Sequence, residues 1–401
     1  MTGFRLPVPT SSLALALIFF LGGLATESPA DEVTAPPASE VERLELHPFY
    51  RKYLSADGIP IVSSEKVSDF ALKEVAFLIE KMIGDRPDLL KAIAAARVRF
   101  SIMAPTEYTT DIPEHSHLDP PEYWDRRARG IGSTPDHPAV SCGEENLLDF
   151  RGDPYSTECI FVHEFAHTIH QQGLNEVDPG FQKRLESVFA KAKLKGLWKG
   201  KYAGTNPAEY WAEGIQSWFD CNRQNDFEHN YVNTREELKE YDPGLAALVE
   251  SVFGESPWRY RKPKDRDPAE SAHLAGYDPA SAPVFQWPAE MIAAYESVER
   301  GDHLEKVPML PLASFAEGET RSPHGENSSE VYLRVDNRTT DTIRFFWLDF
   351  DGRRKNYGQV DPGRRWEQST FPGHLWLATD AEGHPVAFFA AGDKPGLAVI
   401  E

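Results

Sequence analysis

Two histidines spaced four residues apart carry the clearest chemical signal in this sequence. They lie in the segment His163-Glu-Phe-Ala-His167, in which Glu164 directly follows the first histidine. On an α-helix, residues at i and i+4 share a face, so both imidazoles can reach one ion. Two neutral imidazole nitrogens suit Zn²⁺, and Glu164 would stand beside the water that such an ion activates. A carboxylate in that place can take the proton of the water as it attacks a carbonyl. The pattern therefore predicts a zinc-dependent hydrolase.

A buried helix must present these three side chains. Asp153-Pro154 is typical of a helix N-cap followed by proline at the first helical position, and Gly173 is expected to end the helix. The alternative is a surface helix with two solvated histidines. Apolar residues around the motif argue against this alternative, because they indicate that the helix is buried; these residues are Ile160, Phe161, Val162, Phe165, Ala166 and Ile169. Buried histidines require hydrogen-bond or metal partners.

A catalytic zinc needs a third protein ligand, and Glu209 is the candidate. Asn206-Pro207 indicates the start of a second helix, on which Glu209 and Glu213 lie one turn apart on the same face. Glu209 would complete a His/His/Glu set, and Glu213 would accept the second ring N–H of a ligand histidine. The alternative is a solvated acidic face. His170 shares the face of the first two histidines and is expected to be an outer-shell or packing residue.

These two segments together resemble the gluzincin metallopeptidases, most closely the catalytic domain of anthrax lethal factor and its relatives. The resemblance rests on HEFAH followed by YAGTNPAEYWAE, with Tyr202 seven residues before Glu209. It implies Zn²⁺ on His163, His167 and Glu209, Glu164 as general base and acid, and Tyr202 as a donor to the oxyanion. The substrates of lethal factor do not carry over.

The expected zincin fold would extend over about residues 41–300, and gluzincins usually place a substrate-binding strand beside the active-site helix. Residues 130–146 lie just upstream of the motif and are the candidate for that strand by their order alone. His117, Glu144 and Glu145 are candidates for lining the cleft, although we expect them to be solvated loop residues.

The periodicity of the sequence changes after about Gly301. Helical spacing dominates before that point, whereas alternation and DG, DPG and EG turns follow it. We expect residues 301–327 to be a linker and residues 328–401 to be a small all-β sandwich. The predicted fold class is an α+β zincin-like metallopeptidase domain followed by this sandwich.

The β-rich segment resembles the β-domain of the von Hippel–Lindau (VHL) tumour suppressor. The shared elements are NRT, WLDFDG followed by tyrosine, PG, and GHLWL. The resemblance implies a groove that binds 4-hydroxyproline, with a threonine where the family has serine; the matching positions are Trp347, Tyr357, Thr370, His374 and Trp376. The alternative is that the tryptophans fill the sandwich core. The helical domain that recruits a ubiquitin ligase is not matched, so such recruitment is not implied.

The N-terminus and the charge limit the location and the partners. Arg5 precedes an apolar run and small residues, which is typical of a cleaved signal peptide over residues 1–30, with residues 31–40 as a linker. The formal net charge of −21 argues against nucleic-acid binding, and no later run is long enough to cross a membrane. Of this charge, −2 belongs to residues 328–401 and −19 to the rest. Cys142, Cys159 and Cys221 suit export, with one disulfide and one thiol as the simplest arrangement.

These observations predict a secreted or periplasmic zinc metalloendopeptidase that acts on protein or peptide substrates. Its C-terminal module would bring it to a protein partner, and a sharper hypothesis is that the substrates contain hydroxyproline. The alternative from another class is an extracellular binding or adhesion protein with a vestigial zincin domain. The presence of Glu164 argues against that alternative, because a purely structural zinc has no use for a base. A toxin-like protease with a single target is a third reading.

Overall fold

The computed structural model describes residues 32–324 and 329–401, and the predicted signal peptide lies outside them. The chain forms two compact units. We call residues 32–107 and 130–284 the N-terminal unit, and residues 108–129 and 285–401 the C-terminal unit. Within the described residues, every helix is too short or too polar to span a lipid bilayer.

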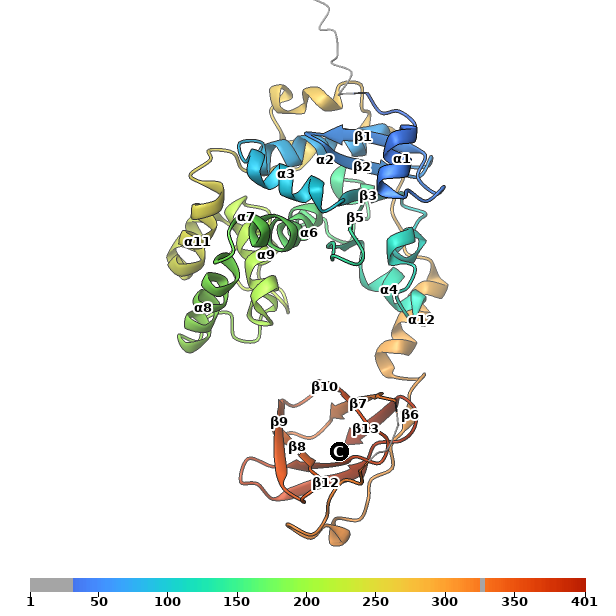
Figure 1. The fold of residues 1–401 in the computed structure, drawn as a ribbon, viewed down its shortest axis with the longest axis vertical. Coiled ribbons are helices and arrows are strands. Elements are labelled where there is room, and N and C mark those ends of the chain that lie inside the picture. Colours follow the sequence, from blue (N-terminus) through green and yellow to red (C-terminus); the bar gives the residue numbers. More distant parts are fainter. Residues whose placement is uncertain (1–31, 325–328) are drawn as a thin grey trace, which may run out of the picture. The chain divides into compact units, whose positions relative to one another are not determined.

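The N-terminal unit contains a five-stranded mixed sheet with strands in the order β1-β2-β3-β5-β4. Figure 1 labels four of these strands, β1, β2, β3 and β5. Strands β2, β3 and β5 run parallel, whereas β1 and β4 pair antiparallel with their neighbours. The bounds are Lys52–Ala56 (β1), Ile59–Ser63 (β2), Arg99–Met103 (β3), Gly130–Ile131 (β4) and Ala139–Gly143 (β5). Strands β2, β3 and β5 are buried along their whole length, as parallel strands inside a covered sheet are. The predicted helical pattern did not include β2 and β3, whereas β4 and β5 lie within residues 130–146, the segment expected to contain a strand.

Helices complete the N-terminal unit and share one apolar core with the sheet. Their bounds are Ala38–Leu44 (α1), Asp69–Ile83 (α2), Pro87–Ala95 (α3), Glu144–Leu147 (α5), Ile160–Thr168 (α6), Asn175–Val177 (α7), Phe181–Leu194 (α8), Pro207–Trp218 (α9), Arg235–Tyr241 (α10) and Pro243–Phe253 (α11). A π-helical segment, Ile169–Leu174, joins α6 to α7.

The ends of the motif helix differ from those expected. Helix α6 begins at Ile160 with Cys159 as its N-cap, whereas Asp153 accepts hydrogen bonds from the Asn146 side chain and the Tyr155 amide. Gly173 does not end the helical path but lies within the π-helical segment. A Cβ atom at Gly173 would approach Leu89 to 3.2 Å, so the glycine permits close packing on α3. Close packing, rather than helix termination, accounts for this residue.

The C-terminal unit contains two four-stranded sheets around a separate apolar core. Their orders are β10-β7-β13-β6 and β12-β11-β8-β9, and Figure 1 shows these strands in orange and red. The bounds are Glu305–Lys306 (β6), Val331–Asn337 (β7), Ile343–Leu348 (β8), Arg354–Val360 (β9), Arg365–Thr370 (β10), Leu375–Thr379 (β11), Pro385–Ala390 (β12) and Gly396–Ile400 (β13). The expected DG, DPG and EG turns are present, with Gly352, Gly363 and Gly383 at positive φ. A mixed α/β region followed by an all-β region is therefore the observed fold class.

The boundary between the parts differs from the expected linker. We call the two sheets of strands β6–β13 the β-domain. Strand β6 pairs with β13, the Leu310 amide donates to the Phe388 carbonyl, and Val307 joins the sandwich core, so part of residues 301–327 belongs to the β-domain. Helices Pro121–Arg127 (α4) and Ala289–Arg300 (α12) pack on one another in the same unit. The guanidinium of Arg126 lies 4.7 Å from the centre of the Trp287 ring in this packing. The C-terminal unit thus begins before the sequence pattern changes.

All three cysteines are buried free thiols in this structure. Cys159 and Cys221 are nevertheless neighbours, since the Cys159 amide donates to the Cys221 carbonyl at 3.1 Å.

Removal of a buried ion pair should destabilise the N-terminal unit. Glu74 on α2 is fully buried and accepts from Arg266 Nη1 at 2.8 Å and from His273 Nε2 at 2.7 Å. We expect Arg266→Met to lower the free energy of unfolding by about 3–5 kcal/mol, because it leaves a buried carboxylate poorly compensated. Urea denaturation measures this change. The control Arg261→Met, at an exposed side chain, should stay within about 0.5 kcal/mol of the wild type; equal losses would contradict the assignment.

Candidate functional site

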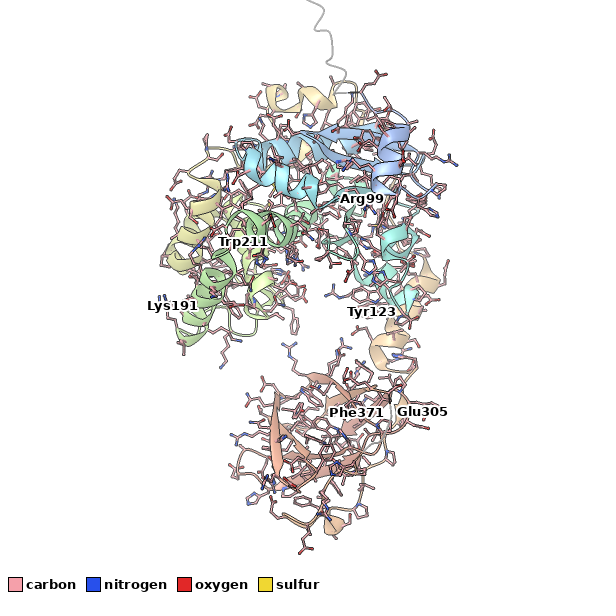
Figure 2. All side chains as sticks on the ribbon, viewed as in Figure 1. Arg99, Tyr123, Lys191, Trp211, Glu305 and Phe371 are labelled. Carbon is pink, nitrogen blue, oxygen red and sulfur yellow. The ribbon has the colours of Figure 1, made fainter. Side chains whose placement is uncertain are left out.

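Helices α6 and α9 lie side by side and supply the histidines and Glu209 (Figure 1). The side chain of Asn206 caps α9 by accepting from the Ala208 and Glu209 amides, which confirms the predicted start of this helix. Trp211, labelled in Figure 2, is fully buried on α9 and donates its indole N–H to the Ala166 carbonyl of α6 at 3.0 Å. This packing sets the distance between the two helices, and hence the distance from Glu209 to the histidines.

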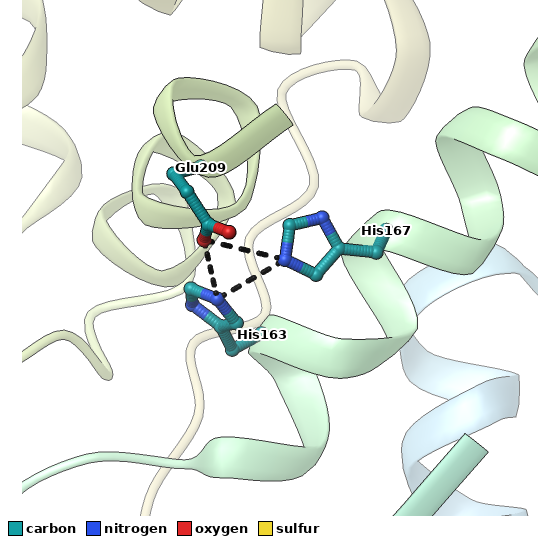
Figure 3. Close-up of side chains that lie close together, drawn as sticks. All are labelled: His163, His167 and Glu209. Carbon is teal, nitrogen blue, oxygen red and sulfur yellow. Dashed lines mark hydrogen bonds and ion pairs between the residues drawn. The ribbon is translucent and has the colours of Figure 1, made fainter. Parts of the chain in front are cut away.

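Three side chains converge between these helices (Figure 3). His163 Nε2 lies 3.2 Å from His167 Nε2 and 3.1 Å from Glu209 Oε2, and His167 Nε2 lies 3.4 Å from the same oxygen. These ligand atoms all lie within 4.8 Å of one another, which is close enough to hold one metal ion. The structure thus brings together the three residues that the sequence predicts as ligands.

Electrostatics make this cluster attractive to a cation. Burial alone would lower the pKa of His163, but the hydrogen bond with Glu209 and the charges of Glu164 and Glu213 raise it to about 10. Burial alone would raise the pKa of Glu209, but the hydrogen bonds and charges of both histidines hold it well below its usual range. Several negative groups therefore surround the two imidazoles and stabilise positive charge there, which a metal cation can supply in place of a proton.

Gln216 orients the first histidine. His163 Nδ1 donates to Gln216 Oε1 at 2.8 Å, which directs the lone pair of Nε2 toward the cluster. Gln216 is held in turn by Glu158, through a 3.0 Å hydrogen bond from Nε2. Glu213, predicted to be the acceptor, lies farther from Nδ1, at 3.6 Å. Gln216 is therefore the hydrogen-bond acceptor in place of Glu213, which stays within ion-pair distance of the same nitrogen as an outer-shell residue. Gln216 could have been found, because it follows Glu213 by three residues on the same helix face.

Glu164 lies beside the cluster and against strand β4. Its carboxylate accepts a hydrogen bond from the Gly132 amide, and burial raises its pKa. A Cβ atom at Gly132 would lie 3.1 Å from His167 Cβ and 3.3 Å from Glu164 Oε2, so a glycine is needed for this close approach. Strand β4 lies at the edge of the sheet, within the segment expected to contain a substrate-binding strand.

Tyr202 lies close to the first histidine of the motif. Its ring centre is 6.2 Å from that of His163, and its amide donates to the Glu228 carbonyl at 2.8 Å. The ring is half-buried at the start of a 3-10 turn, Tyr202–Gly204, that leads into α9. The structure therefore places Tyr202 near the cluster, as its spacing from Glu209 predicts.

Behind Glu213 lie three polar residues that were not predicted from the sequence, Asn222, Asp226 and His229. Glu213 Oε2 accepts from Asn222 Nδ2 at 3.0 Å and pairs with His229 Nε2 at 3.4 Å, while His229 Nδ1 pairs with Asp226 Oδ1 at 2.9 Å. Burial opposes protonation of His229, but Glu213 and Asp226 raise its pKa. These residues come from a loop that has no regular spacing, so no sequence signal pointed to them.

The other candidate residues lie outside the cluster. His170 hydrogen-bonds Gln182 of α8 at 2.7 Å and packs 5.5 Å from the Phe181 ring, which makes it a packing residue. Glu144 and Glu145, expected to be solvated, are buried on α5, and the Glu144 carboxylate accepts from the Ser68 amide. Burial raises the pKa of Glu144 to about 7. His117 is exposed and belongs to the C-terminal unit.

A cavity of about 300 Å³ opens on the β-domain. Its lining includes all five predicted pocket residues together with Phe350, Ser369 and Phe371; the predicted five are Trp347, Tyr357, Thr370, His374 and Trp376. Trp376 belongs to the sandwich core as well, and Trp347 packs partly against that core. The two readings of these tryptophans are thus compatible, since one face of each can pack while another lines the cavity.

Three polar groups of this cavity bear on what it could bind: the Thr370 hydroxyl, the His374 imidazole and the Trp347 indole N–H. Thr370 Oγ1 accepts from Trp376 Nε1 at 3.1 Å and lies 3.4 Å from His374 Nδ1. Burial lowers the pKa of His374, which favours its neutral form. The Trp347 indole N–H is buried and has no hydrogen-bond partner. An unpaired buried donor beside a cavity is a feature that a ligand acceptor would satisfy.

Comparison with known proteins supports the identity of the C-terminal module. A family model described as the VHL beta domain matches residues 321–389, which lie entirely in the C-terminal unit. No curated protein matches the chain.

Metal affinity should distinguish the loss of a ligand from the loss of a residue that orients a ligand. We expect Glu209→Ala to weaken divalent-metal binding by more than about 100-fold, because it removes a ligand, and Gln216→Leu by about 10–100-fold, because it frees the His163 ring. Competition with a chromogenic chelator measures both dissociation constants. Gln182→Leu, which removes the partner of His170, is the matched control and should bind metal as the wild type does. Unchanged affinity in Glu209→Ala would rule out this cluster as the metal site.

Proposed function

We propose that the N-terminal unit is a zinc-dependent metallopeptidase. The convergence of His163, His167 and Glu209 on one point, with Glu164 beside them, is the observation that carries this proposal. The donor set fits zinc, because two imidazole nitrogens and one carboxylate are a ligand set typical of catalytic zinc sites. The hydrogen bond from His163 to Gln216 supports the fit, since it leaves Nε2 free to bind the ion.

Zinc in this position would polarise a substrate carbonyl and make a water molecule more acidic. Glu164 takes a proton from the attacking water and gives it to the leaving amine. Burial raises the pKa of this carboxyl group, which brings it closer to the value suited to a base that also acts as an acid near neutral pH. The Gly132 amide keeps the carboxylate oriented during both transfers.

Tyr202 and strand β4 complete the proposed catalytic arrangement. The Tyr202 phenol would donate to the oxygen that becomes negatively charged in the transition state. Strand β4 is an edge strand next to α6, so its free backbone groups suit pairing with an extended peptide. Glycines at 130 and 132 keep the approach to Glu164 open, since side chains there would meet it.

An extracellular binding or adhesion protein with an inactive N-terminal unit is the alternative. The presence of Glu164 favours the enzyme over this alternative. Burial of its carboxylate costs free energy, and a closed structural metal site has no use for a base that would justify this cost. The N-terminal sequence favours a protein exported from the cell in either case.

We further propose that the β-domain recognises a protein segment that contains proline or hydroxyproline. The cavity has aromatic walls suited to a pyrrolidine ring, while Thr370 and His374 are suited to bind a prolyl hydroxyl. The match to the VHL beta domain supports a role in recognising protein substrates. The methyl group of Thr370, where the family has serine, narrows the cavity.

Glu164→Gln tests the proposed chemistry. We expect this variant to lose peptide hydrolysis by about 10²–10⁴-fold, because the amide cannot accept a proton. A peptide library with mass-spectrometric detection measures the activity, and zinc content is measured on the same samples. The control Glu176→Gln, at an exposed residue of α7, should retain full activity. A chelator should abolish hydrolysis in the wild type, and Zn²⁺ should restore it. Full activity in Glu164→Gln would refute the mechanism, while zinc binding without any hydrolysis would favour the binding-protein alternative.

Thr370→Val tests the recognition of hydroxyproline. We expect the full chain to bind a hydroxyproline peptide more tightly than its proline twin, and Thr370→Val to lose about 1–2 kcal/mol of that preference. Isothermal titration in the Glu164→Gln background measures binding without cleavage. Thr379→Val is the matched control, since Thr379 is equally buried on β11 but does not line the cavity. Equal affinity of the wild type for the two peptides would refute the hypothesis.

A further inference from the structure

A buried histidine, His229, lies next to the metal cluster and contacts a carboxylate on each side of its ring. His229 follows α9 in a loop and is only 4% exposed. Both of its ring nitrogens face carboxylates: Nε2 lies 3.4 Å from Glu213 Oε2, and Nδ1 lies 2.9 Å from Asp226 Oδ1. A ring with an acceptor at each nitrogen has one preferred orientation, so it can fix the groups around it.

The first group that His229 fixes is Glu213. One carboxylate oxygen of Glu213 lies 3.6 Å from Nδ1 of the ligand His163, and the other pairs with His229. Asn222 adds a 3.0 Å hydrogen bond to the second oxygen. Without the imidazole, the second oxygen of Glu213 would keep only the neutral side chain of Asn222 as its hydrogen-bond donor, so this buried carboxylate would be less firmly held beside His163. The position of Glu213 behind the metal ligand therefore depends on His229.

The second group is the segment that carries Tyr202. The Glu228 carbonyl, next to His229 in sequence, accepts from the Tyr202 amide at 2.8 Å, and the two rings lie 6.5 Å apart. Asp226 closes the same loop by accepting from the amides of Glu228 and His229 at 2.8 and 2.7 Å. The ammonium of Lys201, adjacent to Tyr202, donates to the Asp226 carbonyl at 3.0 Å. Displacement of His229 would thus move the loop that holds Tyr202.

We propose that His229, anchored by Asp226, is a positioning residue that supports the ligand His163 through Glu213 and the oxyanion donor Tyr202 through the Glu228 carbonyl. This proposal rests on the proposed metallopeptidase function for its kinetic consequence. Its consequence for metal affinity is independent of that function. The two effects arise from opposite sides of one imidazole ring, so a single substitution should produce both.

The test compares four variants of the full chain by zinc affinity and by steady-state kinetics. His229→Leu should weaken Zn²⁺ binding by about 10–100-fold in a chelator competition, as loss of an outer-shell partner does. At saturating zinc it should lower kcat about 10-fold with little change in KM, because Tyr202 acts only in the transition state. His229→Gln keeps a donor toward Glu213 but cannot reach Asp226, so it should recover most of the zinc affinity but less of kcat.

Two further variants separate positioning from general destabilisation. His273→Leu removes a hydrogen-bonded histidine elsewhere in the N-terminal unit and should leave zinc affinity and kcat unchanged. Asp226→Ala alters a partly exposed anchor and should weaken zinc binding several-fold; it carries the affinity test if His229→Leu does not fold. The absorption spectrum of the Co²⁺-substituted protein should change in His229→Leu or Asp226→Ala but not in His273→Leu.

Unchanged zinc affinity in both His229→Leu and Asp226→Ala would overturn the proposal, as would an equal loss in His273→Leu. If the wild type binds zinc but cleaves no peptide, the proposed function fails, and the affinities still decide the role of His229. If the wild type is active and only zinc affinity responds, the support of Tyr202 is refuted and that of His163 remains.

Discussion

The packing of α6 against α9 is the constraint on which the candidate metal centre depends. The ligands come from two helices far apart in sequence, and a metal ion tolerates only small errors in their separation. Four hydrogen bonds fix that separation. Trp211 donates to the Ala166 carbonyl, Gln216 binds both the His163 ring and the Cys159 carbonyl, and the Cys159 amide donates to the Cys221 carbonyl. The helices are therefore tied along their length, and Glu209 reaches both histidines from a rigid support.

Burial of several acidic groups around the cluster is the second physical problem that this unit solves. Each buried carboxylate has a partner that offsets its desolvation. Glu158 pairs with Arg223 at 2.9 Å, Glu213 with His229, and Glu164 with the Gly132 amide. The negative charges of Glu164, Glu209 and Glu213 also act on the ligand His163, so the surroundings of the cluster favour a cation. The overall acidity of the chain contributes nothing comparable, because solvent screens exposed charges.

The β-domain uses the same residues for stability and for a binding surface. Trp376 is buried in the sandwich core, yet it also lines the cavity and donates to Thr370. Trp347 has its indole N–H buried without a partner, a cost that packing alone would not require. The match to the VHL beta domain covers this region, so the module is supported by both its sequence and its structure.

The amino-acid sequence by itself determined the short-range features. It predicted the face shared by His163 and His167, the cap at Asn206 and the turns of the β-domain, because each depends on neighbours within a few residues. It also predicted the pocket residues through a resemblance. It missed β2 and β3, which are only five residues long and are recognised as strands by their pairing with distant segments, and it misplaced the start of α6, since Asp153 binds elsewhere. Only the tertiary structure decided that Gln216 orients His163 and that His229 stands behind it. These contacts join segments that are distant in sequence, and packing in three dimensions alone determines which of many polar residues meet.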